Sequence, residues 1–372
     1  MNQENPMNDQ HTLNELTAPL EDLKPSTLAK PAPRQMITGH WEQSAVISPN
    51  NFKLKSLSDF AFNTCIGCCH GCRFCYVPNV ATNKQAKQLK PFGVKDPDAE
   101  WGQYVLLRDW DEGKFLASLR TAENMALDKL KPEGNRAVMF CSTTDPYQTL
   151  SGGLTKPHQQ MVRRALELIR DQSTLNVRIL TRSPLARTDF ELMKSFGNRL
   201  MFGMSLPTLN DKLARVFEPY APGVAKRLET LQLAKKAGLN VYVAVAPTYP
   251  DCDEADIRAT LEAVAKLDPL TVFFEPINIR AENVERIRKH AEEIGVTVNL
   301  APFNTTDAWR AYSVEQLQQA ERIAGEVGLA HCLHLWPDKD LPSKDYLQSL
   351  DDPTGFVHWL TGWWTRVSEW PV

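Results

Sequence analysis

The sequence contains no long apolar run and no marked excess of positive charge. No stretch approaches the roughly 18 consecutive apolar residues that a membrane-spanning helix requires. The first residues, MNQENPMNDQ, lack the basic-then-apolar pattern of a secretory signal, and the formal net charge is −3. These absences predict a cytoplasmic chain with no membrane association and no protein-wide positive field that would attract nucleic acid.

Most of the chain also lacks the bias of a disordered protein, because hydrophobic residues make up 42% of its 372 positions. Residues 1–55 are the exception. They are polar, contain prolines and show no periodicity, so they predict a largely disordered N-terminal extension.

Short apolar runs alternate with helix-period segments from about residue 58 to 300, a pattern typical of βαβ units with a parallel sheet. The expected strands are residues 59–64, 136–142, 176–181, 199–205, 240–246 and 271–275, with 296–300 as a seventh run. Residues 222–237 predict a helix. Ser313 followed by Gln316 predicts a capping box that opens another helix, to about Glu326.

Five of the eight cysteines fall within eleven residues, at Cys65, Cys68, Cys69, Cys72 and Cys75. They form two overlapping copies of the spacing Cys-x3-Cys-x2-Cys, which begin at Cys65 and at Cys68. Three close thiolates can hold three irons of a 4Fe-4S cluster and leave the fourth iron open to a small molecule. Such crowding in a large chain without a signal favours metal binding over disulfides.

A structural zinc site is the alternative. Cys65 with Cys68 and Cys72 with Cys75 are two CxxC pairs, which could form a tetrahedral site in a non-enzymatic zinc-binding module. Zinc modules usually need a longer segment between the pairs than the three residues present here. A weaker metal-binding pattern follows at residues 331–334, with the sequence HCLH.

The second register, in which Phe74 precedes the third cysteine, resembles the radical S-adenosylmethionine (radical SAM) superfamily. The segments CSTTDPYQ (141–148), TRSP (181–184), MSLP (204–207) and FEP (217–219) are similar to its spore photoproduct lyase-like branch, also called DNA repair photolyase-related proteins. The resemblance covers about residues 55–300. It implies an α/β fold, with a partial (β/α)6 TIM-like barrel over residues 56–300 and a helical, tryptophan-rich C-terminal extension over 301–372 that packs on the barrel.

The resemblance also implies the cofactors and the residues that bind them. Cys68, Cys72 and Cys75 would bind a 4Fe-4S cluster, which cleaves S-adenosylmethionine reductively to methionine and a 5′-deoxyadenosyl radical. Phe74 occupies a position that packs beside the adenine. The strand-end residues expected at the amino-acid part or the ribose of S-adenosylmethionine are Thr144, Asp145, Arg182 and Ser205.

Two of these residues have alternatives of a purely structural kind. Arg182 suits the carboxylate of S-adenosylmethionine because a guanidinium pairs well with a carboxylate, but a solvated arginine at a helix start is the alternative. Asp145 could instead cap its own loop.

The resemblance further implies a hydrogen-atom donor to the product radical. Spore photoproduct lyase uses a cysteine near the second-strand end, where Cys141 lies. Cys141 precedes Asp145 by four residues instead of three, and a one-residue shift on a strand reverses the side chain's face, so a buried core role is the alternative. Tyr147 is the other candidate donor. The chain departs from many relatives at Thr64 and Cys65, where those carry Pro and Tyr.

The substrate stays open among several classes. The resemblance and a basic stretch predict a DNA lesion, and the basic residues of that stretch are Lys156, Arg163, Arg164, Arg170, Arg178, Arg182 and Arg187. The net negative charge leaves a small molecule, a peptide or RNA as alternatives. The family chemistry implies a low-potential electron donor, ferredoxin or flavodoxin. Four C-terminal tryptophans are expected in the core or, alternatively, on the substrate site: Trp359, Trp363, Trp364 and Trp370.

Overall fold

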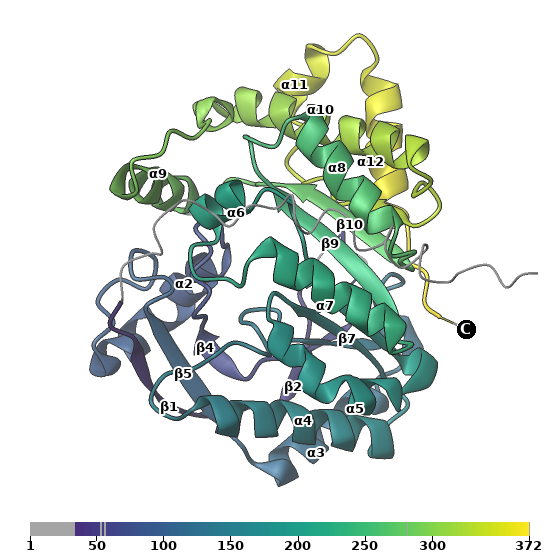
Figure 1. Cartoon of the computed structure of the whole chain (residues 1–372). Coiled ribbons are helices and arrows are strands. Elements are labelled where there is room, and N and C mark those ends of the chain that lie inside the picture. The colour runs from purple at the N-terminus through teal and green to yellow at the C-terminus, as the bar shows by residue number, and fades with distance from the viewer. Residues whose placement is uncertain (1–33, 53, 56, 281, 372) are drawn as a thin grey trace, which may run out of the picture.

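The computed structural model describes residues 34–52, 54–55, 57–280 and 282–371 (Figure 1). Its strands are β1 (Ile37–Ser44), β2 (Ile47–Pro49), β3 (Phe60–Phe62), β4 (Cys65–Gly67), β5 (Tyr104–Asp109), β6 (Ala137–Phe140), β7 (Asn176–Thr181), β8 (Leu200–Ser205), β9 (Asn240–Thr248), β10 (Thr271–Pro276) and β11 (Leu333–Leu335). Its α-helices are α2 (Val77–Leu89), α3 (Glu112–Glu123), α4 (Thr155–Gln172), α5 (Phe190–Lys194), α6 (Asp211–Phe217), α7 (Val224–Lys236), α8 (Glu254–Ala265), α9 (Asn283–Glu293), α10 (Thr306–Glu326), α11 (Lys344–Gln348) and α12 (Pro353–Thr365). Within the described ranges, no helix is long and apolar enough to cross a membrane.

The main sheet has eight strands in the order β11-β10-β9-β8-β7-β6-β3-β2. Every pair from β3 to β11 is parallel, and β2 alone runs antiparallel to its neighbour β3. Strands that follow one another along this series are neighbours in the sheet, with helices as their connections (Figure 1). The predicted α/β class and the six predicted parallel strands are therefore confirmed, and β11 and β2 form the two edges of the sheet.

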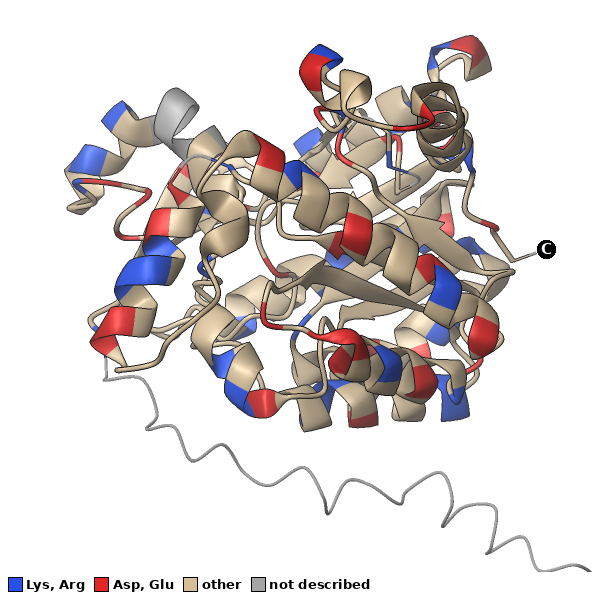
Figure 2. Ribbon diagram, turned by 90° about the horizontal axis from the view of Figure 1, so that it is seen from above, with Lys and Arg blue, Asp and Glu red and all other residues tan. Residues whose placement is uncertain are grey.

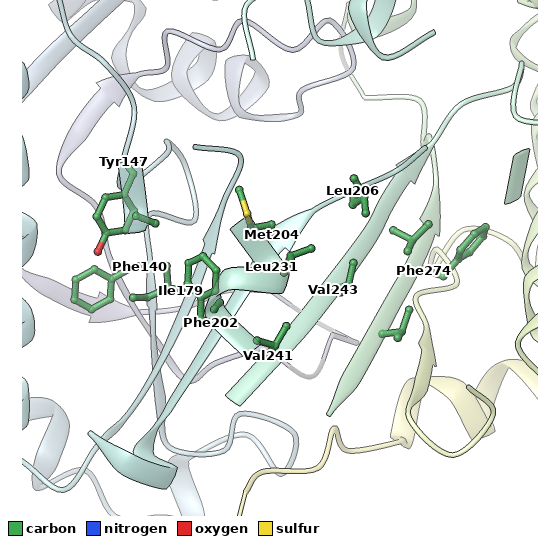
Figure 3. Packing of buried hydrophobic residues seen from close by; sticks show 14 of the residues in the cluster. Phe140, Tyr147, Ile179, Phe202, Met204, Leu206, Leu231, Val241, Val243 and Phe274 are labelled. Atoms are coloured by element: carbon green, nitrogen blue, oxygen red, sulfur yellow. The ribbon is translucent and has the colours of Figure 1, made fainter. Parts of the chain in front are cut away.

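Alternating residues of each strand face two different cores, as the period of a strand requires. On β9, Val241 and Val243 join the large cluster that the helices cover, shown in Figure 3 with Phe202 and Phe274. Tyr242 points to the opposite, inner face. A Cβ atom at Gly203 on β8 would lie 2.3 Å from the Tyr242 ring, so the absence of a side chain at Gly203 makes room for that ring.

A second, three-stranded sheet of order β1-β5-β4 lies beside the main one. Its β4 leads directly into the clustered cysteines. Its β1, together with β2, falls within the N-terminal segment that we expected to be irregular to about residue 55. That expectation does not hold over residues 37–49, because these residues pair with β5 and β3; residues 1–33 lie outside the described residues.

The structure differs from two local expectations near the C-terminal side. Residues 296–300 form no strand; the seventh parallel strand is β11, in the segment that suggested a metal-binding pattern. Ser313 does not open a helix, because α10 begins at Thr306 with the Thr305 hydroxyl accepting from the Ala308 N–H. The predicted end of α10 at Glu326 is correct.

Candidate active site

A cavity of about 550 Å³ opens at the carboxyl ends of the parallel strands. Residues at or just past the carboxyl ends of β6, β7, β8, β10 and β11 contribute to its wall, and these include Cys141, Arg182, Ser205, Glu275 and Trp336. Parallel strands present their carboxyl ends at one edge, which is where α/β enzymes of this type place their chemistry. The sequence-predicted strand ends therefore meet at one site.

The cysteine loop, residues 68–75, forms one wall of this cavity. Cys68, Cys72 and Cys75 line it together with Phe74, whereas Cys65 and Cys69 are not among its lining residues. Cys65 is fully buried in the main hydrophobic cluster, on β4. Of the two overlapping cysteine registers, the one that begins at Cys68 is therefore the one that faces the cavity.

The backbone of the cysteine loop is held by side chains from distant elements. Arg286 of α9 donates to the carbonyl of Arg73 at 3.1 Å and to that of Cys75 at 2.5 Å, and it also pairs with Asp98. The Cys69 N–H donates to Gln148 Oε1 at 2.7 Å. Because these groups satisfy the backbone of the loop from outside, the loop keeps its shape while Cys68, Cys72 and Cys75 line the cavity.

The donor set fits a multi-iron cluster better than a single ion. A zinc ion needs four ligands that converge on one point, and no group of three or more His, Cys, Asp or Glu side chains in the described part of the chain converges in this way. A 4Fe-4S cluster instead takes each thiolate on a separate iron. Three thiols spread along one cavity wall, with the zinc candidate Cys65 turned into the core, match the second case.

Arg182 belongs to a buried ion cluster behind this wall. Its Nε donates to Glu218 Oε1 at 2.8 Å, and Arg227 pairs with the other carboxylate oxygen. Burial alone would raise the pKa of Glu218, but the two guanidinium charges outweigh it and lower that pKa to about 2. Within the described residues the two Nη atoms of Arg182 have no hydrogen-bond partner, and the side chain lines the cavity.

Asp145 and Thr144 connect the loop after β6 to neighbouring segments. Asp145 Oδ1 accepts from the Tyr147 N–H and the Thr181 hydroxyl, and its Oδ2 accepts from the Arg182 N–H, all at 2.7–2.8 Å. The Thr144 hydroxyl donates to the Gly67 carbonyl at 2.7 Å. Both residues line the cavity, but their hydrogen bonds fix the loops around it, which is the capping role expected as the alternative for Asp145.

Ser205 and Phe74 lie on the cavity as the resemblance implied. Ser205 is the last residue of β8 and is almost fully buried. The Phe74 ring packs 5.9 Å from the Tyr249 ring, and the Arg182 guanidinium carbon lies 5.6 Å from its centre. An aromatic face and a guanidinium thus occupy adjacent parts of the same wall.

The two candidate hydrogen donors lie in different places. Cys141 lines the cavity, whereas Tyr147 is fully buried, points into the core of Figure 3 and donates to Asp189 Oδ2 at 3.2 Å. The expectation that Tyr147 is a candidate hydrogen-atom donor is therefore corrected: Tyr147 is a residue of the core. The four-residue spacing to Asp145 had suggested that Cys141 faces the core. Cys141 instead lies just past β6 with a left-handed backbone (φ +60°), and the alternation of side chains along a strand does not extend through such a turn.

The far side of the cavity holds Lys55 and Trp336, which the sequence analysis missed, beside Glu275 at the end of β10. Lys55 Nζ bonds both carboxylate oxygens of Glu275, at 2.7 and 2.6 Å, and lies 4.8 Å from the centre of the Trp336 ring. Trp336 directly follows β11, so a strand predicted over residues 333–335 would have placed Trp336 at a strand end. None of the four C-terminal tryptophans considered for the substrate site is among the described residues that line the cavity.

The basic stretch 151–188 does not form a continuous positive face. Arg178 and Arg182 are not free at the surface, since Arg178 is fully buried and Arg182 faces Glu218. Ion pairs engage Arg163 with Asp189, Arg164 with Glu112, Arg170 with Asp171 and Arg187 with Glu229. Figure 2 accordingly shows basic and acidic residues intermixed over the helices.

Comparisons with known proteins agree with this site. Residues 62–264 match the model of the radical SAM superfamily. An uncharacterized protein of Acidianus two-tailed virus is 32% identical over 240 residues, which cover 63% of this chain and 72% of the viral protein. An uncharacterized protein of Methanocaldococcus jannaschii is 23% identical over 266 residues, covering 71% and 86% of the two chains.

Solved structures share the fold at low sequence identity. A mutant of spore photoproduct lyase superposes with a TM-score of 0.56 at 12% identity, and 81% of each chain is covered. A spore photoproduct lyase mutant with bound AdoMet and dinucleoside spore photoproduct gives 0.54 at 14% identity, again with 81% of each chain covered. The family model covers more than half of this sequence, so the chain belongs to the radical SAM superfamily, whose members use a 4Fe-4S cluster and S-adenosylmethionine as cofactors.

Proposed function

We propose that this chain is an enzyme that cleaves S-adenosylmethionine reductively and uses the resulting 5′-deoxyadenosyl radical to abstract hydrogen from a substrate in the cavity. Cys68, Cys72 and Cys75 would hold the cluster. The observation that carries the proposal is that these three of the five clustered cysteines line the same cavity as Cys141. The chemistry comes from the cofactors, and the chain supplies ligands, orientation and exclusion of water.

The remaining cavity residues divide into two proposed groups. Arg182, Ser205 and Phe74 would contact S-adenosylmethionine, because the free Nη atoms, the hydroxyl and the aromatic face lie on the cavity. Asp145 and Thr144 would hold the loops that carry them, since their oxygen atoms are already bonded to neighbouring segments. Cys141 would return a hydrogen atom to the product radical. Ferredoxin or flavodoxin would supply the electron.

A DNA lesion is the proposed substrate, supported by Cys141 on the cavity wall and by the fold shared with a lyase whose structure contains a dinucleoside spore photoproduct. A small molecule, a peptide or RNA is the second candidate, favoured by the ion pairs that engage most of the basic stretch. To separate them, 5′-deoxyadenosine release is measured with ultraviolet-damaged DNA and with a metabolite extract. Stimulation by damaged DNA together with salt-sensitive DNA binding supports the first, and stimulation by the extract alone supports the second.

The cysteine assignment is tested on protein reconstituted without oxygen. We expect about four irons per chain and dithionite-dependent formation of 5′-deoxyadenosine, both lost in Cys68→Ala. Cys65→Ala is the matched control and should retain both, because Cys65 lies in the core. Zinc without iron, or cleavage that survives Cys68→Ala but not Cys65→Ala, would contradict the proposed metal or the proposed register.

A further inference from the structure

Cys141 is held in an uncommon conformation at the cavity. A left-handed backbone is rare for a residue with a side chain and persists where the surroundings impose it. Here the Cys141 N–H donates to the Phe62 carbonyl at 2.8 Å, which extends the pairing of β3 with β6 by one residue. The side chain is 4% exposed and lines the cavity.

Behind the Cys141 thiol lies a buried chain of polar groups. Thr64 Oγ1 is 3.4 Å from Cys141 Sγ and 2.8 Å from His158 Nε2. Thr64 and His158 are fully buried, on the segment after β3 and on α4. Thr64 is also one of the two positions where this chain departs from many relatives of the resembled branch. One hydroxyl therefore connects the thiol to an imidazole that has no access to solvent.

The chemistry of the three side chains determines which group donates and which accepts in each of the two hydrogen bonds. Burial lowers the pKa of His158 to about 4, so its ring is neutral at neutral pH. A neutral imidazole nitrogen is a good acceptor, whereas a thiol sulfur is a weak one. In the tautomer that carries the ring hydrogen on Nδ1, His158 Nε2 is the acceptor, so the single hydroxyl hydrogen of Thr64 goes to Nε2 and the Thr64 oxygen accepts the hydrogen of the Cys141 thiol.

We propose that Thr64, oriented by His158, is a positioning residue that keeps the hydrogen of the Cys141 thiol turned away from the cavity until a product radical draws it out. This inference rests on the proposed function. Without such a restraint, the thiol is the most easily abstracted hydrogen on the wall. Its S–H bond would break, a C–H bond would form at the 5′ carbon of the deoxyadenosyl group, and a thiyl radical would remain. Dithionite supplies the electron and water the proton that restore the thiol, so S-adenosylmethionine is consumed without product.

This wasteful reaction can be measured without knowing the substrate. Reconstituted enzyme is incubated in D2O with dithionite and S-adenosylmethionine alone, and the 5′-deoxyadenosine is analysed for one deuterium taken from the exchanged thiol. In Thr64→Val we expect the deuterated fraction to rise roughly threefold to tenfold, the factor that corresponds to loss of one hydrogen bond. Thr64→Ser keeps the hydroxyl and should match the wild type. Adding Cys141→Ala to Thr64→Val should abolish the increase.

A second variant and a second readout guard against a folding defect. In His158→Leu the Thr64 hydroxyl loses its acceptor and turns to the sulfur, so the deuterated fraction should rise there too. The infrared S–H stretch of Cys141, identified by subtracting the Cys141→Ala spectrum, should shift to higher frequency in Thr64→Val and stay unchanged in Thr64→Ser. If neither the deuterated fraction nor the S–H stretching frequency changes in Thr64→Val, this inference is overturned. Absence of any 5′-deoxyadenosine would instead count against the proposed function, while the infrared comparison would still decide the role of Thr64.

Discussion

At the scale of single residues, Gly67 shows how closely the cysteine loop is fitted to the small sheet. It is the last residue of β4 and directly precedes Cys68. Its backbone is left-handed, and a Cβ atom there would lie 2.2 Å from the Tyr104 carbonyl oxygen of β5. Gly93 has a similar φ, but nothing lies within 4 Å of the position of its Cβ. A substitution at Gly93 therefore introduces backbone strain alone, whereas the same substitution at Gly67 introduces backbone strain and a steric clash.

Gly67→Ala should cost more stability than Gly93→Ala. At Gly93 the expected loss is about 1 kcal/mol, the cost of a left-handed conformation alone. At Gly67 the new methyl group also forces β4 away from β5, and we expect a loss of about 3 kcal/mol or more, with reduced iron loading. Urea denaturation and iron analysis of both variants provide the measurement. Equal losses of stability in the two variants would mean that β4 and β5 can move apart at Gly67 without cost.

Which of the clustered cysteines line the cavity could be predicted from the sequence, because a spacing rule applies within a single loop. The aromatic residue before Cys75 distinguished the cysteine register that faces the cavity. Tyr147 could not be placed in the same way, because a tyrosine beyond a strand end can point either to the cavity or to the core. Its direction follows from Asp189, which is distant in sequence and accepts its hydroxyl hydrogen.

At the scale of elements, helix α9 acts as a clamp on the cysteine loop. Arg286 on its buried side bonds two carbonyls of the loop and pairs with the buried Asp98. Arg288 on the same helix is partly exposed to solvent and, among the described residues, pairs only with acidic neighbours on α9. The buried side of α9, through Arg286, connects this helix to the cysteine loop, whereas the charged residues on its outer side do not.

Arg286→Met should destabilise the chain by about 3–5 kcal/mol, because it leaves Asp98 buried without its partner. It should also lower iron loading, since the loop carbonyls lose their donors. Arg288→Ala is the matched control and should change neither property noticeably, because exposed ion pairs are weak. Thermal unfolding and iron content are measured side by side. Full iron loading in Arg286→Met would argue that the loop holds its shape without α9.

Element boundaries were predictable where local signals were unopposed. Residues 176–181 form β7 as predicted, because the apolar run has a clear period. The Ser313 capping pattern failed because Thr305, also a good N-cap, starts α10 earlier and Ser313 packs inside it. The run at 296–300 was not a strand, since the sheet edge beside β10 is taken by β11. That competition between segments for one edge is a tertiary effect that no local window contains.

At the scale of the whole molecule, buried histidines make the fold sensitive to acid, and His158 and His334 are two of the four described histidines that are buried with a lowered pKa. Burial lowers the pKa of His158 to about 4 and that of His334 to about 3, from an ordinary value of 6.5. As the pH falls below 6.5, the unfolded chain takes up a proton at each position before the folded chain does. Stability is therefore full above pH 6.5 and declines from there down to the folded pKa values.

Between pH 7.5 and 5 each histidine should lower the free energy of unfolding by about 2 kcal/mol, because only the unfolded form is protonated over most of this window. Urea denaturation of the wild type at the two pH values gives the total loss, and His334→Leu should remove roughly half of the two-histidine share. Comparing both proteins at pH 7.5 first corrects for any packing change. His334 contacts Phe273 on the inner face of the sheet, so an unchanged pH slope in His334→Leu would mean that protons reach this face in the folded state. The reduced slope would show that the inner core below the cavity excludes them.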